Sequence, residues 1–373
     1  MLRRSYLTLY CVVLIFLALT TYAEIWPEAH WAESTPAEAG LDATSLDTMA
    51  AFAGGRGCVV RGGKMVYTWG DATKRGDVAS AVKPWFSTFL FLAVESGKIE
   101  SLDTPLVTFE PRLAEINAAL DHKDRNITFR HAANQTSCYG VTEAPGSAFN
   151  YCDWQMALFA DTLFGKVYSH GWDTVDTAVL APLLTDRLQC EDSPTFSAFG
   201  EKGRRGRLGV SPRDFARFGL LYLRQGRWRD GQVISADHAR MAVTSPLPAE
   251  LPRTARAVSE MIPEQRSLGS EKIPNDQTDH FGSYSWLWWV NGVDRDGLRN
   301  WPDAPVDTFC ALGHKNGQRG LAVIPSLDLI VSWNDTTLGD HPVKEKPLNT
   351  MFKLLMASLL PGCPDEPSST PPE

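Results

Sequence analysis

The sequence contains no run of five or more basic residues and no visible internal repeat. Acidic residues outnumber basic ones, 44 to 36, so the formal net charge is −8 at pH 7. Phosphate backbones and anionic membrane surfaces attract basic patches and repel a net negative surface. We therefore expect no nucleic-acid partner and no strong attraction to an anionic membrane.

Metal-binding signatures are also absent from the sequence. The eight histidines include no H-E-x-x-H spacing, and the seven cysteines include no C-x-x-C pair. Such fixed spacings are what bring two zinc ligands, or two redox-active thiols, to one place in a fold. We therefore expect neither a metal nor another cofactor.

The N-terminus has the features of a signal peptide. Arg3 and Arg4 precede an apolar stretch from Leu7 to Leu19, and Thr21-Tyr22-Ala23 resembles a cleavage site before Glu24. The alternative, an uncleaved anchor, is disfavoured because about 15 apolar residues fall short of the roughly 20 that span a bilayer. Cleavage after residue 23 changes the charge from −8 (36 − 44) to −10 (34 − 44). We predict a periplasmic or extracellular protein with no stable membrane span.

Six cysteines remain after this cleavage. An even number in an exported chain permits three disulfides, which can be connected in 15 ways. These cysteines are Cys58, Cys138, Cys152, Cys190, Cys310 and Cys363.

Apolar periodicity and turn residues divide the rest of the chain into strand-like ends and a helical middle. A Gly62-Gly63 turn indicates a hairpin, and Pro325-Ser326 joins a later strand pair. The predicted strands lie at 57–71, 284–292 and 320–335, and the predicted helices at 84–99, 152–164, 211–228 and 344–360.

This order predicts an α+β fold in one large domain, residues 24–363. An antiparallel sheet would form from both chain ends and be flanked by helices, with a mainly helical insertion at roughly 100–280. Residues 244–280 are expected to form a long, mobile excursion, and the Pro- and Ser-rich residues 364–373 a disordered tail. The junction of sheet and insertion is the expected place for a cleft.

Ser80 and Lys83 have the spacing of a nucleophile and its base. Three residues along a helix return a side chain to nearly the same face, so a neutral Lys83 amine could take the Ser80 hydroxyl proton. The Ser80 N–H at the helix start could stabilise a developing oxyanion. Pro84 lacks an N–H and cannot bond back to the Ser80 carbonyl, which distorts this first turn. An ordinary helix cap beside a solvent-facing lysine is the alternative.

Two later stretches strengthen the catalytic interpretation. Tyr151 and Asp153 lie in "NYCDW", in a loop that leads into a predicted helix. Lys315-Asn316-Gly317 lies in "GHKNGQRG" at the start of a predicted strand, where the glycine permits close approach and the ammonium can hold an anionic group.

In this order the three elements resemble the penicillin-recognising serine hydrolases, which include class C β-lactamases, DD-peptidases and family VIII esterases. The resemblance rests on Ser80-Ala81-Val82-Lys83, Tyr151-Cys152-Asp153 and Lys315-Asn316-Gly317, and it extends over roughly residues 35–360. In the esterase branch of this family a proline often follows the lysine directly, and here Pro84 follows Lys83.

The resemblance implies a role for each matching residue. Ser80 would be the acylated nucleophile, Lys83 its base or proton partner, and Tyr151 the phenol that passes the proton to the leaving group. Lys315, Asn316, Gly317 and Asp153 would bind substrate. The N–H groups of Ser80 and Gln318 would form the oxyanion hole.

Three departures from the family pattern bear on activity. Asp153 replaces the usual amide or hydroxyl, and a carboxylate near Lys83 favours the charged ammonium over the neutral base. Asn316 replaces a hydroxyl that often meets the β-lactam carboxylate. Cys138 and Cys152 fall in or near the motifs, and we hypothesise a disulfide between them.

The sequence thus favours an exported serine hydrolase that acts on a small ester, amide or peptide through an acyl-enzyme. The alternative is a non-catalytic binding protein that keeps the fold and the pocket. Trp286, Trp288 and Trp289 could stack on a sugar, but alternating strand aromatics more often belong to a core.

Overall fold

The structure is a computed structural model that describes residues 24–196 and 205–361. The predicted signal peptide, the predicted tail and Cys363 lie outside these residues. In the part of the chain described, no helix is both long and apolar enough to cross a membrane.

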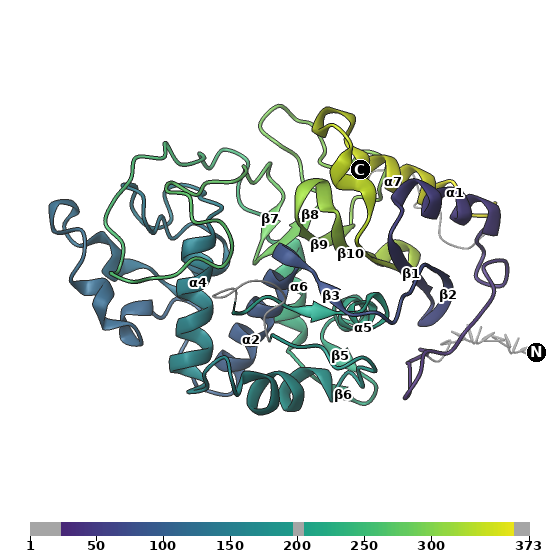
Figure 1. Cartoon of the computed structure of the whole chain (residues 1–373), viewed down its shortest axis with the longest axis horizontal. Coiled ribbons are helices and arrows are strands. Elements are labelled where there is room, and N and C mark those ends of the chain that lie inside the picture. Colours follow the sequence, from purple (N-terminus) through teal and green to yellow (C-terminus); the bar gives the residue numbers. More distant parts are fainter. Residues whose placement is uncertain (1–23, 197–204, 362–373) are drawn as a thin grey trace, which may run out of the picture.

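A seven-stranded antiparallel sheet forms the centre of the fold (Figure 1). Its strand order is β2-β1-β11-β10-β9-β8-β7, so the first two strands pair with strands from the end of the chain. The strands are β1 (Arg56–Arg61), β2 (Lys64–Trp69), β7 (Tyr284–Ser285), β8 (Trp288–Val290), β9 (Phe309–Gly313), β10 (Arg319–Ile324) and β11 (Leu329–Asn334). The predicted sheet from both chain ends is confirmed.

Both faces of this sheet are buried. Successive side chains of a strand point to opposite faces, and in β1 Cys58 and Val60 belong to one core cluster while Val59 belongs to the other. In β11, Ile330 belongs to the first of these clusters and Val331 to the second. The central strands are therefore continuously apolar because helices cover both of their faces.

The two helical layers differ in origin. Helices α1 (Ala43–Ala53) and α7 (Pro347–Met356), from the two chain ends, lie together on one face, as Figure 1 shows. Helix α5 (Pro212–Leu223) packs on the other face, where a Cβ on Gly219 would lie 2.9 Å from Leu321 Cδ1. The remaining α-helices are α2 (Lys83–Glu95), α3 (Phe129–Ala133), α4 (Asp153–Thr162) and α6 (Ala236–Thr244).

Local signals account for most of these boundaries. Ser211 caps α5 by accepting the Asp214 N–H at 3.2 Å, and Pro212 occupies its first turn. The predicted strand 284–292 is instead two short strands, because Trp286 and Leu287 both have positive φ and turn the chain between β7 and β8. Short two-stranded pairs also form between β3 (Gly76–Asp77) and β4 (Gly209–Val210), and between β5 (Arg227–Trp228) and β6 (Gly231–Gln232).

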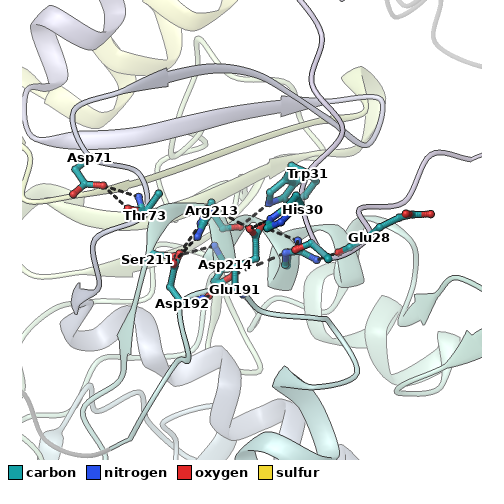
Figure 2. Close-up of polar contacts among 12 residues, drawn as sticks. Glu28, His30, Trp31, Asp71, Thr73, Glu191, Asp192, Ser211, Arg213 and Asp214 are labelled. Atoms are coloured by element: carbon teal, nitrogen blue, oxygen red, sulfur yellow. Dashed lines mark hydrogen bonds and ion pairs between the residues drawn. The ribbon is translucent and has the colours of Figure 1, made fainter.

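A buried polar network ties the N-terminal segment to α5 (Figure 2). Arg217 is fully buried and donates to the carbonyls of Glu28 and Leu188, each at 3.0 Å, and to Glu191 Oε1 at 2.9 Å. Asp214 accepts the backbone N–H groups of Glu191 and Asp192 at 2.8 and 2.7 Å. These hydrogen bonds connect α5, which packs on one face of the sheet, to the N-terminal segment at Glu28.

Candidate active site

The nucleophile turn brings Ser80 and Lys83 into direct contact. Residues Ala79–Val82 form a 3₁₀ turn before α2 begins at Lys83. In a 3₁₀ turn, side chains three residues apart eclipse one another, and Lys83 Nζ donates to Ser80 Oγ at 2.8 Å. Pro84 is compatible with this turn because the Lys83 N–H, and not an N–H of residue 84, bonds to the Ser80 carbonyl. The proline therefore leaves the pair intact.

Asp77 holds the nucleophile turn from its N-terminal side. Its Oδ1 accepts the Ala79 N–H at 2.7 Å, and Ala79 has a φ of 50°, a conformation that costs energy in a residue with a Cβ. Arg207 Nε donates to Asp77 Oδ1 at 3.0 Å, and Arg319 Nη1 lies 3.2 Å from Asp77 Oδ2. Sequence reasoning missed this cluster because Arg207 and Arg319 come from distant segments and none of the three residues belongs to a local motif.

Tyr151 lies beside the lysine. Lys83 Nζ is 4.4 Å from the centroid of the Tyr151 ring, and both side chains are buried. The ring also packs at 5.9 Å on Tyr284 and stacks at 6.1 Å on Trp289. Tyr151 of the second motif therefore contacts Lys83 of the first, and its ring also packs on Tyr284 and Trp289.

Asp153 opens α4 and faces Lys83. Its Oδ1 is 3.8 Å from Lys83 Nζ, so the expected ion pair is present in the structure. Its other oxygen, Oδ2, accepts the Ser270 N–H and Gln277 Nε2, each at 2.8 Å. One carboxylate thus connects the lysine to the segment 268–277.

We call residues 268–277 the strap. Besides its bonds to the carboxylate, the Leu268 N–H donates to the Asp153 carbonyl at 3.1 Å and the Gln277 N–H donates to the Tyr151 carbonyl at 3.0 Å. Asn275 Oδ1 accepts the Asp153 N–H at 2.6 Å. The strap lies inside the predicted excursion at 244–280, which lacks regular helices and strands but is bonded to the second motif.

The third predicted motif forms the turn between β9 and β10. Lys315 lines the same cavity as Ser80. Asn316 and Gly317 also line this cavity, but Asn316 Nδ2 donates to the carbonyls of Leu338 and His341, at 3.1 and 2.9 Å. Asn316 therefore fixes a neighbouring loop.

Gln318, the second predicted oxyanion donor, has both backbone groups hydrogen-bonded in the structure. Its N–H donates to the Lys315 carbonyl at 2.9 Å, and its carbonyl accepts Thr336 Oγ1 at 2.8 Å. The Gln318 N–H is thus used within the turn, and its carbonyl bonds to Thr336, which follows β11. The predicted strand at 320–335 corresponds to β10 and β11, whereas β9, which ends at Gly313, was not predicted.

Gly313, at the end of β9, is the residue that meets the nucleophile turn. A Cβ on Gly313 would lie 2.0 Å from the Val78 carbonyl oxygen and 3.0 Å from the Ala81 nitrogen. Only a residue without a side chain allows this approach. His314 follows at once with a φ of 63° and lines the cavity.

The site opens into a cavity of about 1120 Å³. Ser80, Tyr151, Asp153 and Lys315 all line it. Arg207, Lys315 and Arg319 line the wall of this cavity. Burial lowers the pKa of His314, and the charges of Arg319, Lys315 and Arg207 lower it further. These effects favour the neutral form of the His314 imidazole.

The hypothesised disulfide between Cys138 and Cys152 is not formed in the structure. Cys138 packs against Val141 and Ala148 and donates from Sγ to the Ala148 carbonyl at 3.4 Å, while Cys152 lies at the start of α4. Burial raises the pKa of both thiols to about 11. The cysteines within residues 24–196 and 205–361 are all free.

Within the same described ranges, no group of three or more His, Cys, Asp or Glu side chains is placed to hold a metal ion.

Comparisons with known proteins agree with this geometry. The family model described as Beta-lactamase matches residues 43–258, more than half of the 373-residue chain. A search of curated proteins found no match.

Solved structures share the fold at low sequence identity. A β-lactamase from Mycobacterium bovis is 17% identical, with a TM-score of 0.54 over 84% of this chain and 100% of that one. A class C β-lactamase from Rhodobacter sphaeroides is 16% identical, with a TM-score of 0.53 over 84% and 98%. A Bacillus anthracis protein assigned as a 6-aminohexanoate-dimer hydrolase is 13% identical, with a TM-score of 0.59 over 91% of each chain. The chain belongs to the beta-lactamase family of serine hydrolases.

Proposed function

We propose that this protein hydrolyses a small ester or amide through an acyl-enzyme formed on Ser80. The observation that carries the proposal is the 2.8 Å contact between Lys83 Nζ and Ser80 Oγ at the wall of the cavity. A hydroxyl bonded to a buried amine is the arrangement of an activated serine nucleophile.

In the first half-reaction Ser80 Oγ attacks the substrate carbonyl and its proton passes to Lys83 Nζ. The C–O or C–N bond to the leaving group then breaks, and the leaving atom takes the proton through the Tyr151 phenol. In the second half-reaction water attacks the acyl carbonyl, its proton returns to Ser80 Oγ, and the acid product leaves.

The developing oxyanion needs donors in the strand beside the nucleophile. We propose the N–H groups of Ser80 and His314, in place of Gln318. Support comes from Gly313, which sets the end of β9 directly against the Val78 carbonyl and the Ala81 nitrogen.

A fluorophosphonate probe tests the nucleophile. We expect the probe to label the wild-type protein once and Ser80→Ala not at all, and we expect Ser80→Ala to lose at least ~10³-fold in kcat/KM for an ester substrate. Equal labelling of both proteins, measured by intact mass, would show that Ser80 is not the nucleophile.

A non-catalytic binding protein is the second candidate, and the Asp153–Lys83 ion pair favours it because a fixed ammonium is not a base. Saturable ligand binding that is unchanged in Ser80→Ala, with no turnover of any ester, would support it.

We also propose that the protein acts outside the cytoplasm, on the strength of the signal-peptide features of residues 1–23. N-terminal sequencing of the protein from the exported fraction should begin at Glu24. An intact Met1 there would contradict this proposal.

A further inference from the structure

One side of the active-site cavity is lined by apolar side chains, which we call the apolar arm. These are Trp289, Leu298, Trp301, Leu312, Val343 and Leu348. Four of them, all except Leu298 and Val343, belong to or pack against the core cluster that includes α1 and α7. A Cβ on Gly317 would contact Leu312 and Leu348 at 3.2 and 3.3 Å, which places these two leucines side by side.

The outer part of the arm exposes apolar surface. Leu298 is 58% exposed and Val343 is 78% exposed. With Phe281, they make up three of the eight exposed large apolar side chains found among the described residues, and all three line this one cavity. Apolar surface gathered inside a cavity is the surface that a ligand covers.

Asn291 fixes the loop that carries Leu298 and Trp301. The Asn291 side chain donates to the carbonyls of Trp301, Ala304 and Pro305 at 2.9, 3.1 and 3.0 Å, and its Oδ1 accepts the Trp301 N–H at 2.8 Å. The part of the arm that contains Leu298 and Trp301 is therefore held by hydrogen bonds within the protein.

Three polar side chains of the same wall, those of Arg299, Asp294 and Asn349, are engaged within the protein. Arg299 donates to the Asn291 carbonyl at 2.6 Å, and Asp294 Oδ1 accepts the Leu298 N–H at 2.9 Å. Asn349 donates to Asp303 Oδ2 at 2.6 Å. These bonds occupy three of the polar groups beside the apolar side chains, while Asn300 and Lys346 also line the cavity there.

The stack of Trp289 on Tyr151 places the arm relative to the reaction. In the proposed function Tyr151 gives its proton to the leaving oxygen, so the group attached to that oxygen lies beside Tyr151. We propose that the apolar arm binds the alcohol part of the substrate, and that the substrates are esters of apolar alcohols. This inference rests on the proposed function and adds the substrate class.

Three esters test the inference on the full chain: ethyl acetate, octyl acetate and ethyl octanoate. The last two are isomers, with the long chain on the alcohol or on the acyl side. We expect kcat/KM, measured by pH-stat titration, to be at least ~10-fold higher for octyl acetate than for either of the others. Equal values, or a preference for ethyl octanoate, would overturn the inference.

Variants at exposed positions test the arm without disturbing the core. Val343→Ser and Leu298→Ser should each lower the ratio of kcat/KM for octyl acetate over ethyl acetate by about fivefold. Val306→Ser is the matched control, because Val306 is 69% exposed and lies outside the cavity lining. An unchanged ratio in both arm variants, or an equal fall in the control, would overturn the assignment.

Fluorophosphonate labelling separates this inference from the proposed function. Labelling at Ser80 without a preference for octyl acetate contradicts the apolar arm alone. Absence of labelling and of turnover contradicts the proposed function.

Discussion

At the scale of single residues, Asp153 is the position where charge decides activity. One of its oxygens faces Lys83 at 3.8 Å and the other holds the strap through Ser270 and Gln277. In Asp153→Asn the amide oxygen can keep both strap bonds while the charge beside Lys83 is lost. A nearby carboxylate favours the charged ammonium over the neutral base, so we expect Asp153→Asn to raise kcat/KM for an ester substrate at pH 7 by about 10-fold.

Gln277→Ala is the control for this prediction. It removes a strap bond and keeps the carboxylate, so kcat/KM should stay at the wild-type value. A rise of equal size in both variants would assign the effect to the strap. Among the site residues, spacing predicted the pairs Ser80–Lys83 and Tyr151–Asp153, and the resemblance to the penicillin-recognising serine hydrolases implied that the two pairs meet. Asp77 could not be predicted, because its partners Arg207 and Arg319 are far away in the chain.

At the scale of elements, the end of β9 positions the nucleophile turn. The sequence predicted strands and helices well where the signal was local, as with Ser211 and Pro212 at the start of α5. It did not predict β9, the strand beside the nucleophile turn, which is only five residues long. The ladder between β9 and β10 ends at Gly313 paired with Arg319, before the motif.

Gly313→Ala tests this placement. The new Cβ would meet the Val78 carbonyl oxygen at 2.0 Å, so the strand or the nucleophile turn must shift. Since a misplacement of about 1 Å can cost ~10²-fold in rate, we expect at least that loss in kcat/KM. Gly165→Ala, where a Cβ meets nothing within 4 Å, is the matched control and should keep full activity. Comparable activity in the two variants would show that the close approach is not needed.

At the scale of the whole molecule, the sheet from both chain ends could be predicted because strand-like patterns occupy the two ends. The buried network around α5 could not. Asp214 (Figure 2) and Arg217 look like ordinary charges on an amphipathic helix, yet both are fully buried and bind segments elsewhere in the chain. These charged side chains face inward because of the tertiary packing, which the sequence pattern alone does not predict.

Asp214 makes the stability of the whole molecule depend on pH. Burial raises its pKa to about 6 from a usual value of 3.8. Below pH 4 the carboxyl is protonated in both the folded and the unfolded chain. Between pH 4 and 6 the unfolded chain loses this proton while the folded chain keeps it, so the free energy of unfolding falls by about 3 kcal/mol and then levels off. Asp214→Asn cannot titrate and should lack this fall. Urea unfolding of both proteins from pH 4 to 7 measures the difference, and parallel curves would show that Asp214 is already ionised in the folded protein at pH 4.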